Sequence, residues 1–224
     1  MSRKPKSGET GSITSGPAPQ GPPRRLIVGI SGASGVAYGI RLLQMLNALD
    51  VEPHLVMSKA AEMTIGYETN LAPKDVEKLA HTVYRQDDVG AAISSGSFKT
   101  MGMVVAPCSI RSMSEIATGV TSSLLTRSAD VVLKERRKLV LMVRETPLHT
   151  GHLRSMTQLS EMGAIIAPPV PAFYANPETV DDIVTQSAAR VLDLFGLEAD
   201  ETKRWGEDLT GGRRRPVSRG RKPS

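Results

Sequence analysis

The chain has little cysteine and few aromatic residues. Its 224 residues include one cysteine, Cys108, and 4% aromatic side chains. A single thiol excludes an internal disulfide and cannot by itself build a zinc site, which is typical of a reducing compartment. No stretch approaches 18 consecutive apolar residues, and the basic start at Arg3, Lys4 and Lys6 has no apolar segment behind it. We therefore expect no membrane span, no secretory signal and a cytoplasmic location.

The body of the chain also lacks a strong charge of one sign. The formal net charge is +5, but the excess of basic residues lies in the two ends. Both ends are rich in glycine, proline and serine, so we expect disordered tails over residues 1–23 and, with a basic character, over residues 206–224. The single domain expected between them, residues 24–205, is nearly neutral, which argues against nucleic acid as a partner.

Apolar runs alternate with helical patterns along this domain. Strands are predicted at residues 26–30, 53–57, 103–106, 139–143 and 164–167, with Pro107 ending the third. Strands that are apolar on both faces and separated by helices indicate a parallel sheet with helices on both faces. The expected fold is therefore a single-domain α/β fold of the Rossmann-like or flavodoxin-like kind.

Two later helices carry cations. One is predicted to hold Arg127 and the basic run from Lys134 to Lys138 on a solvated face. The other is predicted to begin with Asn176 as its N-cap and Pro177 at its first helical position. Arg190 lies at the border of the apolar stripe of that second helix. Periodicity does not decide whether it extends to solvent or faces an anion.

The first strand runs into Ser31-Gly-Ala-Ser-Gly35, a loop of small residues before a helix. The loop has neither the Gly-Lys-Ser/Thr of a phosphate-binding loop nor the glycine spacing of a dinucleotide fold. We expect the unpaired N–H groups at the start of that helix to favour an anion or a polar ring edge.

Ligands of open α/β sheets bind outside the carboxyl ends of the strands. Polar side chains that follow the predicted strands are therefore expected to share one crevice: Ser31, Ser34, Ser58, Ser109, Arg144, Glu145 and Tyr174. Arg144 and Glu145 directly follow a strand that is expected to be buried. Charged groups are costly to bury without a partner, so we expect these two to have one.

Other patterns give weaker signals. His149 and His152 have metal-ligand spacing but no third ligand, so no metal site is predicted. The aspartate pairs at 87–88 and 181–182 lack the further aspartates of a magnesium-bridged diphosphate site, which favours a monophosphate held by Arg, Lys and Tyr. Cys108 is expected near a helix N-terminus, and with no histidine base evident it is interpreted as a packed thiol rather than a nucleophile.

Residues 25–205 resemble the UbiX-type flavin prenyltransferases. The resemblance depends on a series of motifs in the order of that family: Ser31-Gly-Ala-Ser-Gly35, Ser58-Lys59, Glu68-Thr69-Asn70, Ser94-Ser95-Gly96-Ser97, Pro107-Cys108-Ser109, Arg127, Leu133-Lys-Glu-Arg-Arg137, Arg144-Glu145-Thr146-Pro147, Phe173-Tyr174 and Arg204-Trp205. It implies an enzyme that joins the dimethylallyl group of dimethylallyl monophosphate to N5 and C6 of reduced FMN. The product, prenylated FMN, would serve UbiD-type decarboxylases.

The resemblance also assigns residues, which are expectations here. The cofactor-binding positions are Gly32, Ala33, Ser34, Ser58, Ser109, Ile110, Arg111, Ser112 and Arg144. At Ile110 and Arg111 the small polar run of the family is interrupted, so contacts from their backbone are expected. The prenyl phosphate would be bound by Arg127, Lys134, Tyr174 and Arg190, while Ser34, Glu68, Lys134 and Glu145 would be catalytic. The family forms large homo-oligomers with sites shared between subunits.

Two other functions remain open. An FMN-dependent decarboxylase acting on a cysteine-containing peptide would have the same kind of fold, although no Pro-x-Met-Asn-type substrate motif is present in the sequence. A non-catalytic flavin-binding subunit of a decarboxylase system would not need a second phosphate site. The presence of Lys134, Glu145, Tyr174 and Arg190 therefore favours the prenyltransferase.

Overall fold

The computed structural model describes residues 24–199 and residue 204. The tails expected over residues 1–23 and 206–224 lie outside these residues, as does Trp205. Within the described part of the chain, no helix combines the length and the apolar character needed to cross a membrane.

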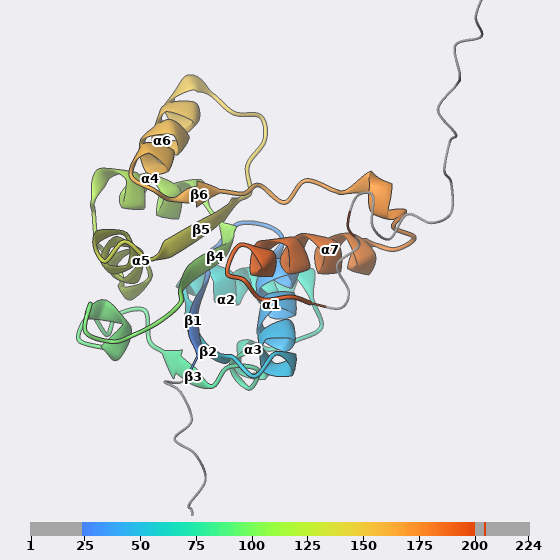
Figure 1. Ribbon diagram of the computed structural model, residues 1–224, viewed down its shortest axis with the longest axis horizontal. Helices are drawn as coiled ribbons and strands as arrows, with labels where there is room; N and C mark the ends of the chain where they lie inside the picture. The colour runs from blue at the N-terminus through green and yellow to red at the C-terminus, as the bar shows by residue number, and fades with distance from the viewer. Residues whose placement is uncertain (1–23, 200–203, 205–224) are drawn as a thin grey trace, which may run out of the picture.

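Six parallel strands form one sheet in the order β3-β2-β1-β4-β5-β6 (Figure 1). Their bounds are β1 Arg25–Ile30, β2 Glu52–Met57, β3 Thr82–Tyr84, β4 Gly102–Cys108, β5 Lys138–Val143 and β6 Ile165–Ile166. This is the strand order of a doubly wound Rossmann sheet, so the predicted fold class is confirmed. The order reverses between β1 and β4, and the crevice at that point lies outside their carboxyl ends.

Seven helices connect or cover the strands in the described residues. They are α1 Val36–Ala48, α2 Lys59–Glu68, α3 Pro73–Glu77, α4 Ile110–Thr118, α5 Leu124–Lys134, α6 Thr150–Glu161 and α7 Val180–Asp193. Short 3₁₀ turns occupy Ala92–Ser94 and Phe173–Ala175.

The two faces of the sheet have separate hydrophobic cores. Successive side chains of a strand point to opposite faces, so Val28 of β1 packs in the core that includes Leu43 of α1 and Leu192 of α7. Its neighbour Ile27 packs in the other core, which includes Leu125 of α5. Figure 1 shows α1 and α7 side by side, away from α4, α5 and α6. Helices therefore cover both faces, as the sequence predicted.

Two boundaries differ from the sequence prediction, and one strand was not predicted. Strand β4 does not end at Pro107 but continues to Cys108, and the Ala106–Pro107 peptide bond is cis. Asn176 does not cap a helix: its φ of 51° is left-handed, and α7 begins four residues later with Thr179 as its N-cap. Strand β3 has only three residues and no buried side chain, so it carries no apolar run to detect.

The basic run after Arg127 is not one solvated helical face. Helix α5 ends at Lys134, and Lys138 already belongs to β5. The side chain of Arg137 is 14% exposed and donates to the carbonyl oxygens of Gly96 and Phe98 at 2.5 and 2.7 Å. Buried carbonyl groups need such donors, so this cation fixes a loop instead of facing water.

Candidate functional site

A buried serine ties together the two strands at the reversal point. Ser31, which follows β1, is 1% exposed. Its Oγ donates to the carbonyl oxygen of Pro107 at 2.8 Å and accepts from the N–H of Ser109 at 2.7 Å. These bonds hold the loop after β1 against the loop after β4 and so shape the crevice between them.

Two helices begin at this crevice. Ser58 caps α2 by accepting from the N–H of Ala61 at 3.0 Å, and Ser109 caps α4 by accepting from the N–H of Ser112 at 3.3 Å. The remaining first-turn N–H groups have no acceptor within their own helix, and the helix dipole makes each terminus partly positive. Both termini therefore suit an anionic or strongly polar ligand.

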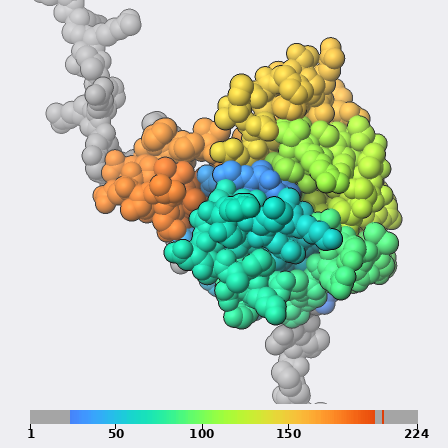
Figure 2. Space-filling view, turned by 180° about the vertical axis from the view of Figure 1, so that it is seen from behind, coloured from blue at the N-terminus to red at the C-terminus, as the bar shows by residue number. Residues whose placement is uncertain are grey.

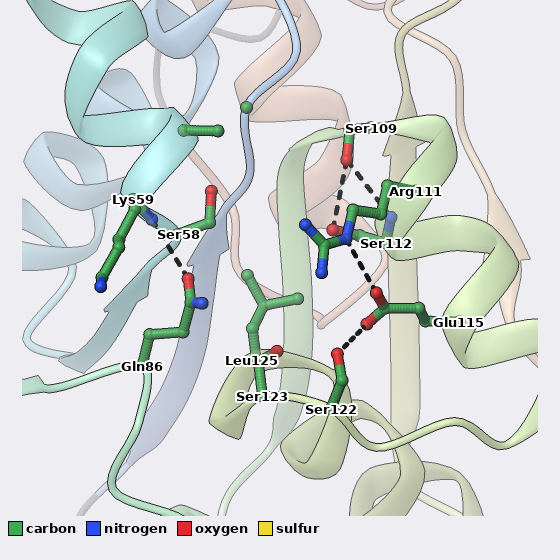
Figure 3. Close-up of a pocket in the computed structure, with 12 residues that line it drawn as sticks. Ser58, Lys59, Gln86, Ser109, Arg111, Ser112, Glu115, Ser122, Ser123 and Leu125 are labelled. Atoms are coloured by element: carbon green, nitrogen blue, oxygen red, sulfur yellow. Dashed lines mark hydrogen bonds and ion pairs between the residues drawn. The ribbon is translucent and has the colours of Figure 1, made fainter.

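A cavity of about 320 Å³ lies between these two termini (Figure 3). This volume falls at the lower end of the range of roughly 300–1,000 Å³ that is usual for ligand pockets. Its lining residues are Gly32, Ser58, Lys59, Ala60, Gln86, Ser109, Arg111, Ser112, Glu115, Ser122, Ser123 and Leu125. Five of the nine predicted cofactor-binding positions are among them: Gly32, Ser58, Ser109, Arg111 and Ser112.

Gly32 brings the backbone of its loop unusually close to α2. A Cβ atom at this position would lie 2.3 Å from the Cβ of Ala60. No larger residue fits without moving the loop or the helix. The cavity wall at Gly32 is therefore bare backbone.

Charged groups on one side of the cavity are held by mutual bonds. Arg111 donates from Nε to Glu115 at 2.9 Å, and Ser122 donates to the other carboxylate oxygen at 2.6 Å. Burial raises the pKa of Glu115, but these bonds from Ser122 and Arg111 outweigh it and hold the pKa below its ordinary value. In Figure 3 the Arg111 guanidinium stands across the cavity from Ser58 and Lys59.

Sequence reasoning missed several cavity residues. Gln86 follows the undetected β3, and its Oε1 accepts from the N–H of Lys59 at 3.1 Å. Ser123 caps α5 together with Thr126, and this Ser-x-x-Thr pattern was the available signal.

The other predicted cofactor positions do not line the cavity. Ala33 and Ser34 lie in the loop before α1, and Ile110 begins α4. Arg144 follows β5, and its N–H donates to the carbonyl oxygen of Cys108 at 3.0 Å. These four residues lie at the same carboxyl edge of the sheet as the cavity. A single chain therefore brings all nine predicted cofactor-binding positions to one edge, but only five of them line the cavity.

One expectation about charged groups at this edge is wrong. Arg144 and Glu145 are exposed, so burial does not force them to find a partner. Glu145 accepts a hydrogen bond from the N–H of Thr146 at 3.0 Å. The N–H groups at the start of α1 do meet an anion, which comes from this chain. Glu68 accepts from the N–H groups of Gly35 and Val36 at 2.8 and 3.0 Å, which also places its carboxylate beside the loop of Ser34.

The predicted phosphate-binding residues do not meet within one chain. Arg127 and Lys134 lie on α5, where they pair with Asp130 at 2.6 Å and Glu135 at 2.9 Å. Arg190 lies on α7, which packs on the opposite face of the sheet. It pairs with Asp193 at 2.8 Å and lines a separate cavity of about 210 Å³.

That second cavity lies beside the loop after β6. Its other lining residues include Met142, Ala167, Pro168, Pro169 and Val170. Tyr174 follows in the 3₁₀ turn Phe173–Ala175 and is half-buried. The expected crevice shared by Ser31 through Tyr174 is therefore wrong for a single chain, because Tyr174 lines neither cavity.

Cys108 is fully buried, and burial raises the pKa of its thiol to about 12. A neutral thiol at physiological pH is a poor nucleophile, which supports the packing interpretation. His149 caps α6 by accepting at Nδ1 from the N–H of Gly151 at 3.0 Å, and its ring centroid lies 3.5 Å from that of His152.

Comparisons with known proteins identify the family. The Flavoprotein family matches residues 17–192. The flavin prenyltransferase UbiX of Thauera aromatica is 53% identical over 88% of this chain and 100% of its own length. UbiX of Escherichia coli K12 is 58% identical over 80% of this chain and 95% of its own. The chain belongs to the UbiX flavin prenyltransferase family.

Solved structures of UbiX proteins agree with this assignment. AnUbiX (PadA1), in complex with FMN and dimethylallyl pyrophosphate, has a TM-score of 0.81 and 48% identity over 82% of this chain and 98% of its own. A dodecameric FMN-dependent UbiX-like decarboxylase from E. coli O157:H7 has a TM-score of 0.79 and 53% identity over 81% and 98%. Cysteine decarboxylases such as SpaF are 18% identical and share the fold alone.

Proposed function

We propose that this chain is a flavin prenyltransferase that joins a dimethylallyl group to N5 and C6 of reduced FMN. The observation that carries the proposal is its identity of 53–58% with UbiX flavin prenyltransferases over nearly their whole length. The cavity at the reversal point supports it, because two capped helix N-termini and several hydroxyl groups there suit the phosphate and polar edges of a flavin nucleotide.

FMN is a substrate in this reaction. Gly32, Ser58, Ser109, Arg111 and Ser112 would bind it from the walls of the cavity, and Ala33, Ser34, Ile110 and Arg144 from its edge. At Ile110 and Arg111 the first-turn N–H groups of α4 would donate. The bare backbone at Gly32 would let the flavin approach the loop closely.

The prenyl phosphate would be bound between copies of the chain. Because α5 and α7 cover opposite faces of the sheet, Lys134 and Arg127 of one copy would meet Tyr174 and Arg190 of another. The segment around the 3₁₀ turn Phe173–Ala175 protrudes from the body (Figures 1 and 2), and Val170, Phe173 and Val180 on it are 73–77% exposed. Exposed apolar side chains of this kind are typical of subunit contacts.

The proposed residues match the charges that develop during transfer. As the C–O bond of the donor breaks, negative charge gathers on the phosphate and positive charge on the allyl group. Lysine and arginine fixed at the phosphate lower that barrier without a metal ion. Glu68 and Ser34 would move the proton near N5, and Glu145 would take the proton that leaves as the ring closes at C6.

The donor we propose is dimethylallyl monophosphate, and prenylated FMN would be consumed by a UbiD-type decarboxylase in the cytoplasm. The related AnUbiX was crystallised with dimethylallyl pyrophosphate, so the choice of phosphate is part of the test. A decarboxylase acting on a cysteine-containing peptide is less favoured, because the cysteine decarboxylase SpaF is 18% identical to this chain and shares the fold alone.

The test is the mass of the flavin after anaerobic incubation of the full chain with reduced FMN and each donor separately. We expect a flavin heavier by one five-carbon unit with the monophosphate and slower conversion with the pyrophosphate. Bound flavin of unchanged mass with either donor would favour a non-catalytic flavin-binding subunit instead.

A further inference from the structure

A group of potential metal ligands lies at the amino-terminal end of the sheet. Glu52 and His54 are on β2, and His81 directly precedes β3. One ligand atom from each of the three side chains lies within 4.8 Å of the other two. The cavity begins at Ser58, which follows His54 by four residues and Glu52 by six, so roughly 13–20 Å of extended chain separates the two sites.

The three side chains converge on a small volume. Nε2 of His54 is 3.8 Å from one oxygen of Glu52, and Nε2 of His81 is 3.7 Å from the other. Ligands of tetrahedral zinc, each about 2.1 Å from the metal, lie about 3.4 Å from one another. Each of these two nitrogen–oxygen distances exceeds that spacing by a few tenths of an ångström, and one ligand atom from each of the three residues lies within 4.8 Å of the other two.

One of these nitrogens is buried with its bonding capacity unused. His54 is 3% exposed, and within the described part of the chain its Nε2 has no hydrogen-bond partner. Buried polar atoms are rarely left in this state because each costs free energy. A metal ion at this point would accept the lone pair that nothing in the described structure uses.

Every potential ligand is already oriented by a second group. Nδ1 of His54 is 2.9 Å from Tyr84 Oη, and Nδ1 of His81 is 3.1 Å from Thr82 Oγ1. Arg25 donates to Oε2 of Glu52 at 2.8 Å, which leaves Oε1 facing His81. Metal-binding histidines and carboxylates are characteristically held in this way, with the non-coordinating nitrogen of the ring bonded elsewhere.

We propose that Glu52, His54 and His81 bind one divalent transition-metal ion, zinc above all, at a site separate from the flavin cavity. Two imidazoles and a carboxylate are a donor set that zinc accepts. The guanidinium of Arg25 opposes the charge of the metal and keeps the affinity moderate. His81 is half-exposed, so water can complete the coordination. The ion would fasten the three-residue edge strand β3 to β2.

Zinc titration of the tag-free full chain tests the proposal. We expect one zinc ion per chain by calorimetry, and Co²⁺ as a spectroscopic substitute should give a visible absorption band. The variant His81→Gln, at an exposed position, should lower zinc affinity by about tenfold or more. Glu52→Gln should do the same without removing a buried ring.

His152→Gln is the matched control, because His152 belongs to the other histidine pair. It should bind zinc as the unchanged chain does. Saturating zinc should also raise the Tm of the unchanged chain by roughly 5 °C and that of His81→Gln much less. No zinc uptake by the unchanged chain, equal affinity in His81→Gln, or loss of binding only in His152→Gln would each overturn the proposal.

Discussion

Single residues determine the shape of the cavity wall. At Gly32 the backbone of the loop lies too close to α2 for any side chain. The atom that Gly32→Ala adds would sit 2.3 Å from Ala60, so the loop or α2 must move. We expect the variant to lose about 1–3 kcal/mol of stability and to bind FMN more weakly. Chemical denaturation and a flavin titration would measure the two effects.

Gly66→Ala is the control for that variant. Gly66 lies on α2, the helix that Gly32 approaches, and nothing in the described structure lies within 4 Å of a Cβ added there. It should be unchanged or up to about 1 kcal/mol more stable, since alanine favours helix. Equal behaviour of the two variants would contradict the close approach at Gly32.

Cys108 gives a prediction that depends on pH. Burial raises the pKa of its thiol to about 12 in the folded chain, above the value of about 8.5 for an exposed thiol. The folded chain therefore keeps its thiol protonated between these values, and ionisation there favours unfolding. Alkylation at pH 9 should be slow in the native chain and fast in denaturant, as mass spectrometry would show. Rapid alkylation of the native chain would contradict the burial of this thiol.

Strands and helices with a strong apolar period were predictable from the sequence. Strand β5 is buried from Leu139 to Val143, and these five residues are the apolar run from which the strand was predicted. Strand β3 was not predictable, because it lies at the edge of the sheet and its three residues pack weakly. Nor was the start of α7: Asn176 and Pro177 satisfy the local rules for a helix start, but the backbone at Asn176 turns left-handed.

Helix α1 provides a test at the level of the element. The carboxylate of Glu68 accepts from the N–H groups of Gly35 and Val36, where a negative charge also complements the helix dipole. Glu68→Gln should destabilise the fold by about 0.5–1 kcal/mol, measured by denaturation. Glu62→Gln, on the same helix α2 and exposed, should have a smaller effect. A larger loss in Glu62→Gln would contradict the capping role.

The arrangement of strands and helices in the whole molecule determines which site residues could be predicted from the sequence to lie together. Ser58 and Ser109 follow β2 and β4, the parallel strands on either side of β1, so the topology brings them to the same edge of the sheet. Lys134 and Arg190 have no such constraint, because their helices cover opposite faces of the sheet. The sequence pattern of one chain predicts its helices and strands, but it does not predict which residues of two copies lie next to each other.

Mixing two inactive variants tests the shared site. Lys134→Ala and Arg190→Ala should each lose most prenyl transfer when assembled alone. In hetero-oligomers formed by co-expression, random pairing should restore about one site in four. Turnover assays on such mixtures would measure the recovery. Activity that stays at the level of the separate variants would contradict a site shared between copies.

The most direct test of the account asks where the five-carbon unit is bonded. The full chain would be incubated without oxygen with reduced FMN and carbon-13-labelled dimethylallyl monophosphate, and the flavin examined by NMR. We expect labelled carbons bonded to both N5 and C6, closing a fourth ring. Unmodified FMN accompanied by the intact donor or by free dimethylallyl alcohol would contradict it.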